Sequence, residues 1–221
     1  NASNYYYAVM VVTLSNNIED KSSISAANSL AIPVSETVAD PQPVLQHQAT
    51  ENDGTLRYEY ALWGNNQQTP HFPAFNNAGS YAHNFTVFKS GNSTNKSIYV
   101  LFKDDNPFST AGIKLCTDCN VLKIDDRLPN GVDSYWSGWN ENYNMYSTTN
   151  PVPTTGVVKM YTQYRLKETL EWVRKSISAD SNRVYLTGVS HNGYGALLTS
   201  QMWPGQVTAV WVKNPPTVIK P

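Results

Sequence analysis

Hydrophobic and polar residues alternate along several short stretches from about residue 56 onward. In "LRYEYAL" (56–62) every second residue is apolar or aromatic, which predicts a half-buried strand. "NFTVFK" (84–89) is read in the same way, and "NVLKID" (120–125) is a further candidate strand. "SIYVLF" (97–102) is more continuously apolar, which favours a central strand covered on both faces.

A 3.6-residue period replaces this alternation over residues 158–177. One apolar stripe runs along the segment and predicts a helix, through Leu166, Leu170, Val173 and Ile177. A strand at 183–187, a helix that opens at His191 and a strand within 205–214 are expected to follow. Strands and helices in this alternating order predict an α/β fold, with a mostly parallel sheet and flanking helices.

Residues 1–40 have a different pattern. "YYYAVMVV" (5–12) is aromatic and β-branched and predicts a buried strand, and "NSLAIPVSE" (28–36) is a second candidate strand. Two prolines then stiffen residues 41–55, which we expect to be an extended linker. The predicted organisation is therefore a short β module, a linker and an α/β domain over residues 56–221.

Composition and charge narrow the classes of partner. The 221 residues carry a formal net charge of -1, with a pI near 6.5, which argues against nucleic acid. Only 15% of the residues are charged while 12% are aromatic, and Asn and Ser are abundant, a surface chemistry common in extracellular β-rich proteins. No run is long and apolar enough to span a membrane. We expect a secreted, multidomain protein without a cofactor or a bound metal.

The two cysteines form a single motif, Cys116-Thr-Asp-Cys119. In an oxidising compartment this pair would close a short local disulfide, whereas zinc binding or redox catalysis is the less favoured alternative because no second pair accompanies it. Sequons for N-glycosylation occur at Asn1, Asn84, Asn92 and Asn95.

The stretch "RVYLTGVSHNGYGA" (183–196) carries the candidate chemistry. A β-rich run reaches Gly188, Ser190 follows two residues later, and small residues come after it. This order is typical of a nucleophile elbow, where a sharp strand-to-helix turn presents a serine and requires small neighbours. Asn192 stands where that pattern usually has glycine, and Asn tolerates left-handed backbone better than most residues.

The wider segment resembles the α/β-hydrolase superfamily, and within it the secreted esterase, depolymerase-like and predicted-peptidase group. The resemblance covers roughly residues 97–221 and rests on the helix, the "DSNR" turn, the "VYLT" strand, the Gly-x-Ser elbow and "GYGA", in this order. The N-terminal pair "YYYAVMVV…NSLAIPVSE" looks like the last two strands of a fibronectin type III module. The chain thus resembles an incomplete α/β-hydrolase-like domain that follows the end of a β module.

The resemblance implies roles for particular residues. Ser190 would be the nucleophile, and the backbone N–H groups of His191 and Lys103 would form the oxyanion hole. The segment "DDRLPNGVDSYWSGWNENY" (125–143) looks like the aromatic rim of such a site, with Tyr135, Trp136 and Trp139 as the residues that would face the substrate. The alternative for this segment is a long loop folded on its own aromatic residues.

Three departures from the superfamily pattern argue against activity of this chain alone. After Ser190 there is no Asp or Glu, and the only later histidine is its neighbour His191, although the superfamily order is Ser, then acid, then His. Asp104 and Asp105 follow the strand at 97–102, where carboxylates would oppose a developing oxyanion. The sheet also stops one strand after the elbow. Three histidines precede the serine in the chain: His47, His71 and His83.

Two functions therefore remain open from the sequence. In the first, the chain is part of a secreted serine carboxylesterase or depolymerase that acts on an ester or carbohydrate-linked substrate, with its acid and histidine outside these residues. In the second, the scaffold has no chemistry and serves an extracellular structural, adhesion or filament-forming role through self-association. Asp125 and Asp126 are expected to be solvated turn residues rather than ligands of a hard cation.

Overall fold

The computed structural model describes residues 3–9, 12–13, 18–19, 22, 24–36, 40–64, 66–78, 81–89, 91, 94–103 and 118–216. The chain divides into two compact units, Asn1–Asp40 and Pro41–Pro221. We describe each unit by itself.

The N-terminal unit contains short antiparallel pairings. Strand β1 (Ser3–Tyr5) pairs with β4 (Val34–Glu36), and β2 (Val12–Thr13) pairs with β3 (Ile18–Glu19). The buried strand predicted over residues 5–12 is not found among the described residues, because Tyr6 is 69% and Val9 is 79% exposed. A unit of this size has too little chain to cover its own apolar side chains.

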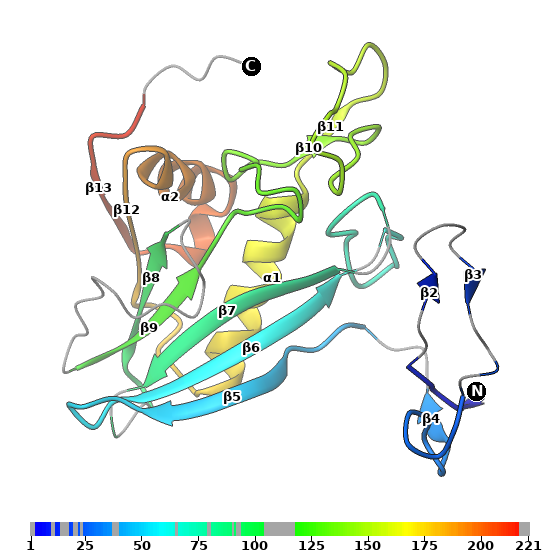
Figure 1. Ribbon diagram of the computed structural model, residues 1–221. Helices are drawn as coiled ribbons and strands as arrows, with labels where there is room; N and C mark the ends of the chain where they lie inside the picture. The colour runs from blue at the N-terminus through cyan, green and yellow to red at the C-terminus, as the bar shows by residue number, and fades with distance from the viewer. Residues whose placement is uncertain are drawn as a thin grey trace. The chain divides into compact units, whose positions relative to one another are not determined.

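The larger unit is built on a seven-stranded sheet with the order β13-β12-β8-β9-β7-β6-β5 (Figure 1). The neighbours β13, β12, β8 and β9 pair in parallel, while β9, β7, β6 and β5 pair antiparallel. The sheet is thus mixed, and its parallel half carries the elbow. The strand bounds are β5 Val44–Thr50, β6 Leu56–Gly64, β7 Tyr81–Lys89, β8 Ser97–Phe102, β9 Cys119–Ile124, β12 Val184–Val189 and β13 Ala209–Lys213.

Part of the segment expected to be a linker is instead a strand. Val44–Thr50 (β5) pairs antiparallel with β6, and its register shifts between Leu45 and His47. The edge of β6 that faces away from β7 carries a row of backbone N–H and C=O groups, and the extended segment 44–50 forms hydrogen bonds with them. Both prolines, Pro41 and Pro43, precede this strand.

In the described part of the chain, two α-helices pack on the sheet. Helix α1 (Tyr161–Ser176) begins three residues later than predicted, because Val158–Lys159 form strand β11 and pair with β10 (Trp139–Asn140). Helix α2 (His191–Met202) follows β12 directly, and the short 3-10 helix η2 (Pro204–Gln206) leads into β13. Among the described residues, no helix combines the length and apolarity needed to cross a membrane.

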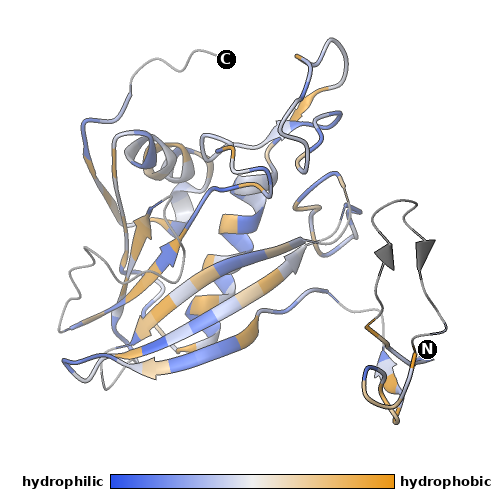
Figure 2. Ribbon diagram, viewed as in Figure 1, coloured by the Kyte–Doolittle hydropathy of each residue, from blue (hydrophilic) through white to orange (hydrophobic). Residues whose placement is uncertain are grey.

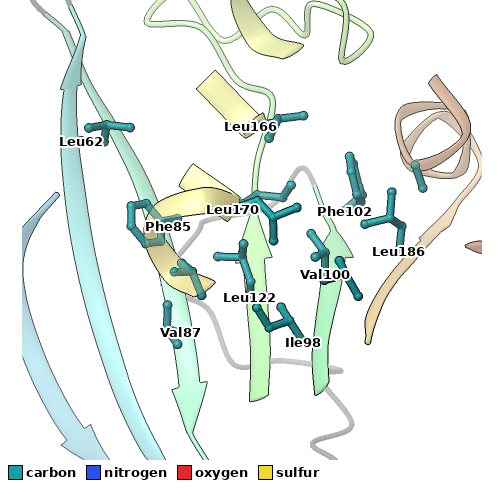
Figure 3. Close-up of a cluster of buried hydrophobic side chains, with 14 of the residues drawn as sticks. Leu62, Phe85, Val87, Ile98, Val100, Phe102, Leu122, Leu166, Leu170 and Leu186 are labelled. Atoms are coloured by element: carbon teal, nitrogen blue, oxygen red, sulfur yellow. The ribbon is translucent and has the colours of Figure 1, made fainter. Parts of the chain in front are cut away.

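The main core lies between the sheet and the two helices. Side chains from the strands and from α1 point into a shared layer in Figure 3, and α2 contributes Ala196 to the same cluster. Figure 2 shows hydrophobic and hydrophilic residues alternating along the strands, which is the period-2 pattern that the sequence predicts. Strand β9, rather than β8, is buried along its whole length. Burial of this apolar layer holds the parallel strand ends in fixed register.

Candidate active site

Ser190 lies at the junction between β12 and α2. Its φ and ψ are 56° and -131°, a combination that non-glycine residues rarely adopt and that costs about 1–3 kcal/mol. The Ser190 N–H donates a hydrogen bond to the Lys213 carbonyl of β13 at 2.9 Å, and the serine is exposed. The turn is therefore strained, anchored to the neighbouring strand and open to solvent.

The glycines around Ser190 allow close approach between the strand and the helix. A Cβ on Gly188 would lie 2.3 Å from the carbonyl oxygen of Asn192. A Cβ on Gly195 would lie 2.3 Å from Cγ of Trp136. A larger residue at Gly188 would push the backbone of α2 away from β12, and one at Gly195 would displace the Trp136 ring. The small residues in the sequence therefore have a direct packing cause.

The predicted oxyanion-hole amides have different environments. His191 is the first residue of α2. The first N–H groups of a helix have no acceptor within the helix, and the helix dipole favours negative charge there. The Lys103 N–H instead donates to the Ile124 carbonyl at 3.1 Å, within the β8–β9 pairing. The prediction for Lys103 is therefore wrong, because the sheet ladder extends one residue beyond β8. Asp104 and Asp105 lie outside the described residues.

The side chain of His191 faces the loop that follows β9. Its Nε2 lies 4.0 Å from Oδ2 of Asp133, and its ring centroid is 6.3 Å from that of Tyr135. A separation of 4.0 Å is an ion pair when the imidazole is protonated and is too long for a hydrogen bond. His191 thus contacts residues of the loop with its side chain, while its backbone belongs to the elbow.

Two of the other histidines lie on strands away from β12. His83 is in the middle of β7, three strand positions from β12, which corresponds to about 14 Å between strand axes. It is buried, and the loss of solvation together with the nearby Arg165 charge holds its pKa well below the ordinary value. His47 lies on β5, two strands further away, with Nδ1 3.4 Å from Oε2 of Glu59. Neither strand position allows contact with Ser190.

Asp125 and Asp126 are buried rather than solvated, contrary to the expectation from the sequence. They directly follow the central strand β9, and the loop after them folds over the strand ends. Burial is the main cause that raises the pKa of each carboxyl group to about 6. Arg165, which is also buried, opposes this shift and donates from Nη2 to the Asp125 carbonyl at 3.0 Å.

Asp126 organises the loop through its two carboxylate oxygens. Oδ1 accepts a hydrogen bond from Oγ of Ser134, and Oδ2 accepts one from the Trp136 N–H at 2.7 Å. The Ser134 hydroxyl lies 2.7 Å from Oγ1 of Thr162 on α1. No local turn motif in the sequence predicts these contacts of Asp126, because its partners lie up to 36 residues away in the chain, at Thr162.

The predicted aromatic rim is mostly interior. Trp136 is fully buried and Trp139 is nearly so, and only Tyr135 exposes about half of its side chain, at 49%. Trp139 packs on Tyr161 with ring centroids 4.8 Å apart, and its Nε1 donates to Oδ1 of Asn77 at 2.9 Å. The prediction that Trp136 and Trp139 face a substrate is wrong, because their rings pack on Phe102 of β8 and Tyr161 of α1, while Tyr135 stays at the surface.

The remaining predicted modification sites are placed as follows. Cys119 is disulfide-bonded, while Cys116 lies outside the described residues. Asn84 is half-buried within β7, opposite Ala61, and β7 is an interior strand that pairs with β6 and β9. Asn95 is exposed in a turn with φ 58°. Asn1 and Asn92 lie outside the described residues. No group of three or more metal-binding side chains occurs in the part of the chain that is described.

Comparison with known proteins supports the fold. No protein-family model and no curated protein sequence matches the chain. Among solved structures, an acetyl xylan esterase from Paenibacillus sp. R4 matches with a TM-score of 0.50 and 16% identity, over 79% of this chain and 53% of that chain. A glucuronoyl esterase from Solibacter usitatus matches with a TM-score of 0.50 and 9% identity, over 79% of this chain and 52% of that chain. The chain spans about half the length of these structures.

The fold class follows from the sheet order, the strand-to-helix turn at Ser190 and these structural similarities. The larger unit has the α/β-hydrolase fold, in the form of a mixed sheet with two helices on it. In open α/β sheets, sites form at the carboxyl ends of the parallel strands. Ser190 follows β12 at that edge, and Asp125 and Asp126 follow β9 at the same edge.

Proposed function

We propose that the chain carries the nucleophile of a serine esterase. Ser190 Oγ attacks the carbonyl carbon of an ester, and the His191 amide donates a hydrogen bond to the oxygen that becomes negative. The tetrahedral intermediate expels the alcohol and leaves an acyl-serine, which water then hydrolyses to free acid and Ser190. The histidine that takes the serine proton and the acid that orients it are assigned to polypeptide outside these 221 residues.

One observation carries this proposal. Ser190 holds φ 56° and ψ -131° between a parallel strand and a helix, and this strain has no evident value for stability. Strained non-glycine residues persist where the surroundings enforce them, and they concentrate at functional sites. Here two contacts enforce the turn: the hydrogen bond from the Ser190 N–H to the Lys213 carbonyl, and the close approach of Gly188 to Asn192. The reactive position also lies at the start of α2, where the helix favours developing negative charge.

The proposed substrate class is a carboxylic ester attached to a carbohydrate. Tyr135 exposes a flat ring next to His191, and such rings stack on sugar faces. The two structures with this fold reported above are named as an acetyl xylan esterase and a glucuronoyl esterase, which supports an ester substrate of this kind. The disulfide at Cys119 supports an extracellular location, because disulfides persist in oxidising compartments.

Hydrolysis of p-nitrophenyl acetate and of acetylated xylan tests the proposal in the natural full-length polypeptide that carries these residues. Ser190→Ala should lower kcat/KM by about 1,000-fold or more, because no other group forms the acyl intermediate. Ser178→Ala is the matched control, since Ser178 is also exposed and has φ 51° but follows α1 at the other end of the strands. Equal activity of wild type and Ser190→Ala, or no activity in either, would reject the esterase and favour a scaffold without chemistry.

A further inference from the structure

A pair of buried polar side chains joins the loop after β9 to the first turn of α2. Trp136 Nε1 donates a hydrogen bond to Oδ1 of Asn192 at 3.0 Å, and both residues are buried. Asn192 occupies the position two residues after Ser190, where the elbow pattern usually has glycine. In this chain the side chain at that position therefore has a specific partner.

The indole of Trp136 also lies between the end of β8 and the helix. Its ring centroid is 4.7 Å from that of Phe102, the last residue of β8, at an interplanar angle of 62°. On the other side it covers Gly195 of α2 so closely that a Cβ there would lie 2.3 Å from Cγ. The ring thus sets the spacing between the end of β8 and α2, whose first residue, His191, carries the proposed oxyanion-hole amide.

Trp136 is itself held in a strained conformation by buried hydrogen bonds. Tyr135 and Trp136 have consecutive positive φ values of 51° and 60°. The Trp136 N–H donates to Oδ2 of Asp126 at 2.7 Å, and its carbonyl accepts from Nε2 of Gln163 on α1 at 2.6 Å. Gln163 Nε2 also donates to Oγ1 of Thr199 on α2 at 3.0 Å. Strand β9 and helices α1 and α2 therefore all fix one tryptophan.

We infer that Trp136 is a positioning residue for the Ser190 elbow. Through Asn192 and Gly195 it holds the first two turns of α2 against the end of β8, so that Ser190 and the His191 amide keep their relative geometry. The positioning of α2 rests on the contacts of Trp136 described here, and its effect on turnover rests on the proposed esterase function. Displacement of reacting groups by about 1 Å lowers rates by about 100-fold, so loss of this contact should act on turnover.

Amide hydrogen exchange tests the structural part independently of activity. Trp136→Phe keeps an aromatic ring but removes Nε1, and Trp139→Phe is the matched control because it removes the indole bond to Asn77 in the same loop. The amides to follow are those of Gly193 and Tyr194, which donate to the Ser190 carbonyl at 2.9 and 3.2 Å. We expect exchange about tenfold faster or more in Trp136→Phe and unchanged in Trp139→Phe. Equal exchange in the two variants would overturn the inference.

Kinetics of the natural full-length polypeptide test the second part. Trp136→Phe should lower kcat about tenfold with KM within about twofold, while Trp139→Phe should change neither. Adding Asn192→Gly to Trp136→Phe should restore part of kcat. In Trp136→Phe the Asn192 side chain loses the Trp136 donor, whereas the double variant has the glycine that is usual at this position.

The two failures can be told apart. An inactive wild type with faster exchange in Trp136→Phe would reject the esterase and keep the positioning role. An active wild type with the same kcat in both tryptophan variants would reject the positioning role and keep the esterase.

Discussion

Replacing Gly195 with alanine should destabilise the hydrolase-like unit, although alanine favours helices. A Cβ at this position of α2 would lie 2.3, 2.5 and 2.7 Å from Cγ, Cδ1 and Cδ2 of Trp136. Distances below 3.0 Å are essentially never seen for real Cβ atoms, so the indole must move. Trp136 has no free volume for this movement, because it is fully buried and packs on Phe102.

The opposing contributions can be compared in magnitude. Alanine in place of glycine favours a helix interior by about 1 kcal/mol. Overpacking of a buried site costs about 1–3 kcal/mol, and displacing the indole from Asn192 costs about 1–3 kcal/mol more for a buried N–H that loses its acceptor. The net expectation for Gly195→Ala is a decrease of about 1–5 kcal/mol, with a central value of about 3 kcal/mol, in the free energy of unfolding. For a unit of this size the central value corresponds to a Tm lower by about 6–12 °C.

Urea denaturation and calorimetry of Gly195→Ala, wild type and Gly205→Ala provide the assay. Gly205 is the matched control, because a Cβ there meets nothing within 4 Å. Its substitution should change the free energy of unfolding by less than about 0.5 kcal/mol. If Gly195→Ala were as stable as the control, Trp136 would not be held as tightly as its contacts indicate, and the argument from its packing would fail.

Further predictions concern the buried charges beneath the loop. The pKa of Asp125 is raised from 3.8 to about 6 in the folded state, so folding takes up a proton between these pH values and the free energy of unfolding should fall as pH rises through this window. The fall is at most about 3 kcal/mol for one such group, and urea titrations from pH 4 to 7 should show a flatter profile for Asp125→Asn. An equal slope in that variant would contradict the assignment. Arg165→Met removes the buried cation beside Asp125 and Asp126 and should lower the free energy of unfolding at pH 7 by about 3–5 kcal/mol. Calorimetry would compare the free energy of unfolding with that of Arg127→Met. Arg127 is exposed, and its substitution should change the free energy of unfolding by less than about 1 kcal/mol.

The parts of the fold that local pattern determines are predictable from the sequence. The continuous apolar run at 97–102 coincides with β8, and the alternation from Leu56 lies within β6. The elbow follows from spacing alone, since the glycines near Ser190 are where the strand and helix come within contact distance. Each of these features depends on residues close together in the chain, which explains why pattern suffices.

The features that the sequence did not predict depend on partners far apart in the chain. Asp126 resembles a turn residue in sequence, yet Ser134 and Trp136 reach it through a loop with two left-handed residues. Trp136 resembles an exposed rim residue, yet it is buried against α2, which is 56 positions later at Asn192. Amphipathic aromatic side chains fit both a surface and an interior, so composition alone could not decide between them.

The most direct test of the central claim is reaction of the natural full-length polypeptide with a fluorophosphonate, followed by mass spectrometry. Trypsin would release residues 184–213 as one peptide, since no Lys or Arg lies between Arg183 and Lys213. The account predicts an adduct on this peptide that fragmentation assigns to Ser190 and not to Ser200, and that disappears in Ser190→Ala. An unmodified peptide in wild type, or an adduct on Ser200, would mean that the strained turn at Ser190 presents no nucleophile.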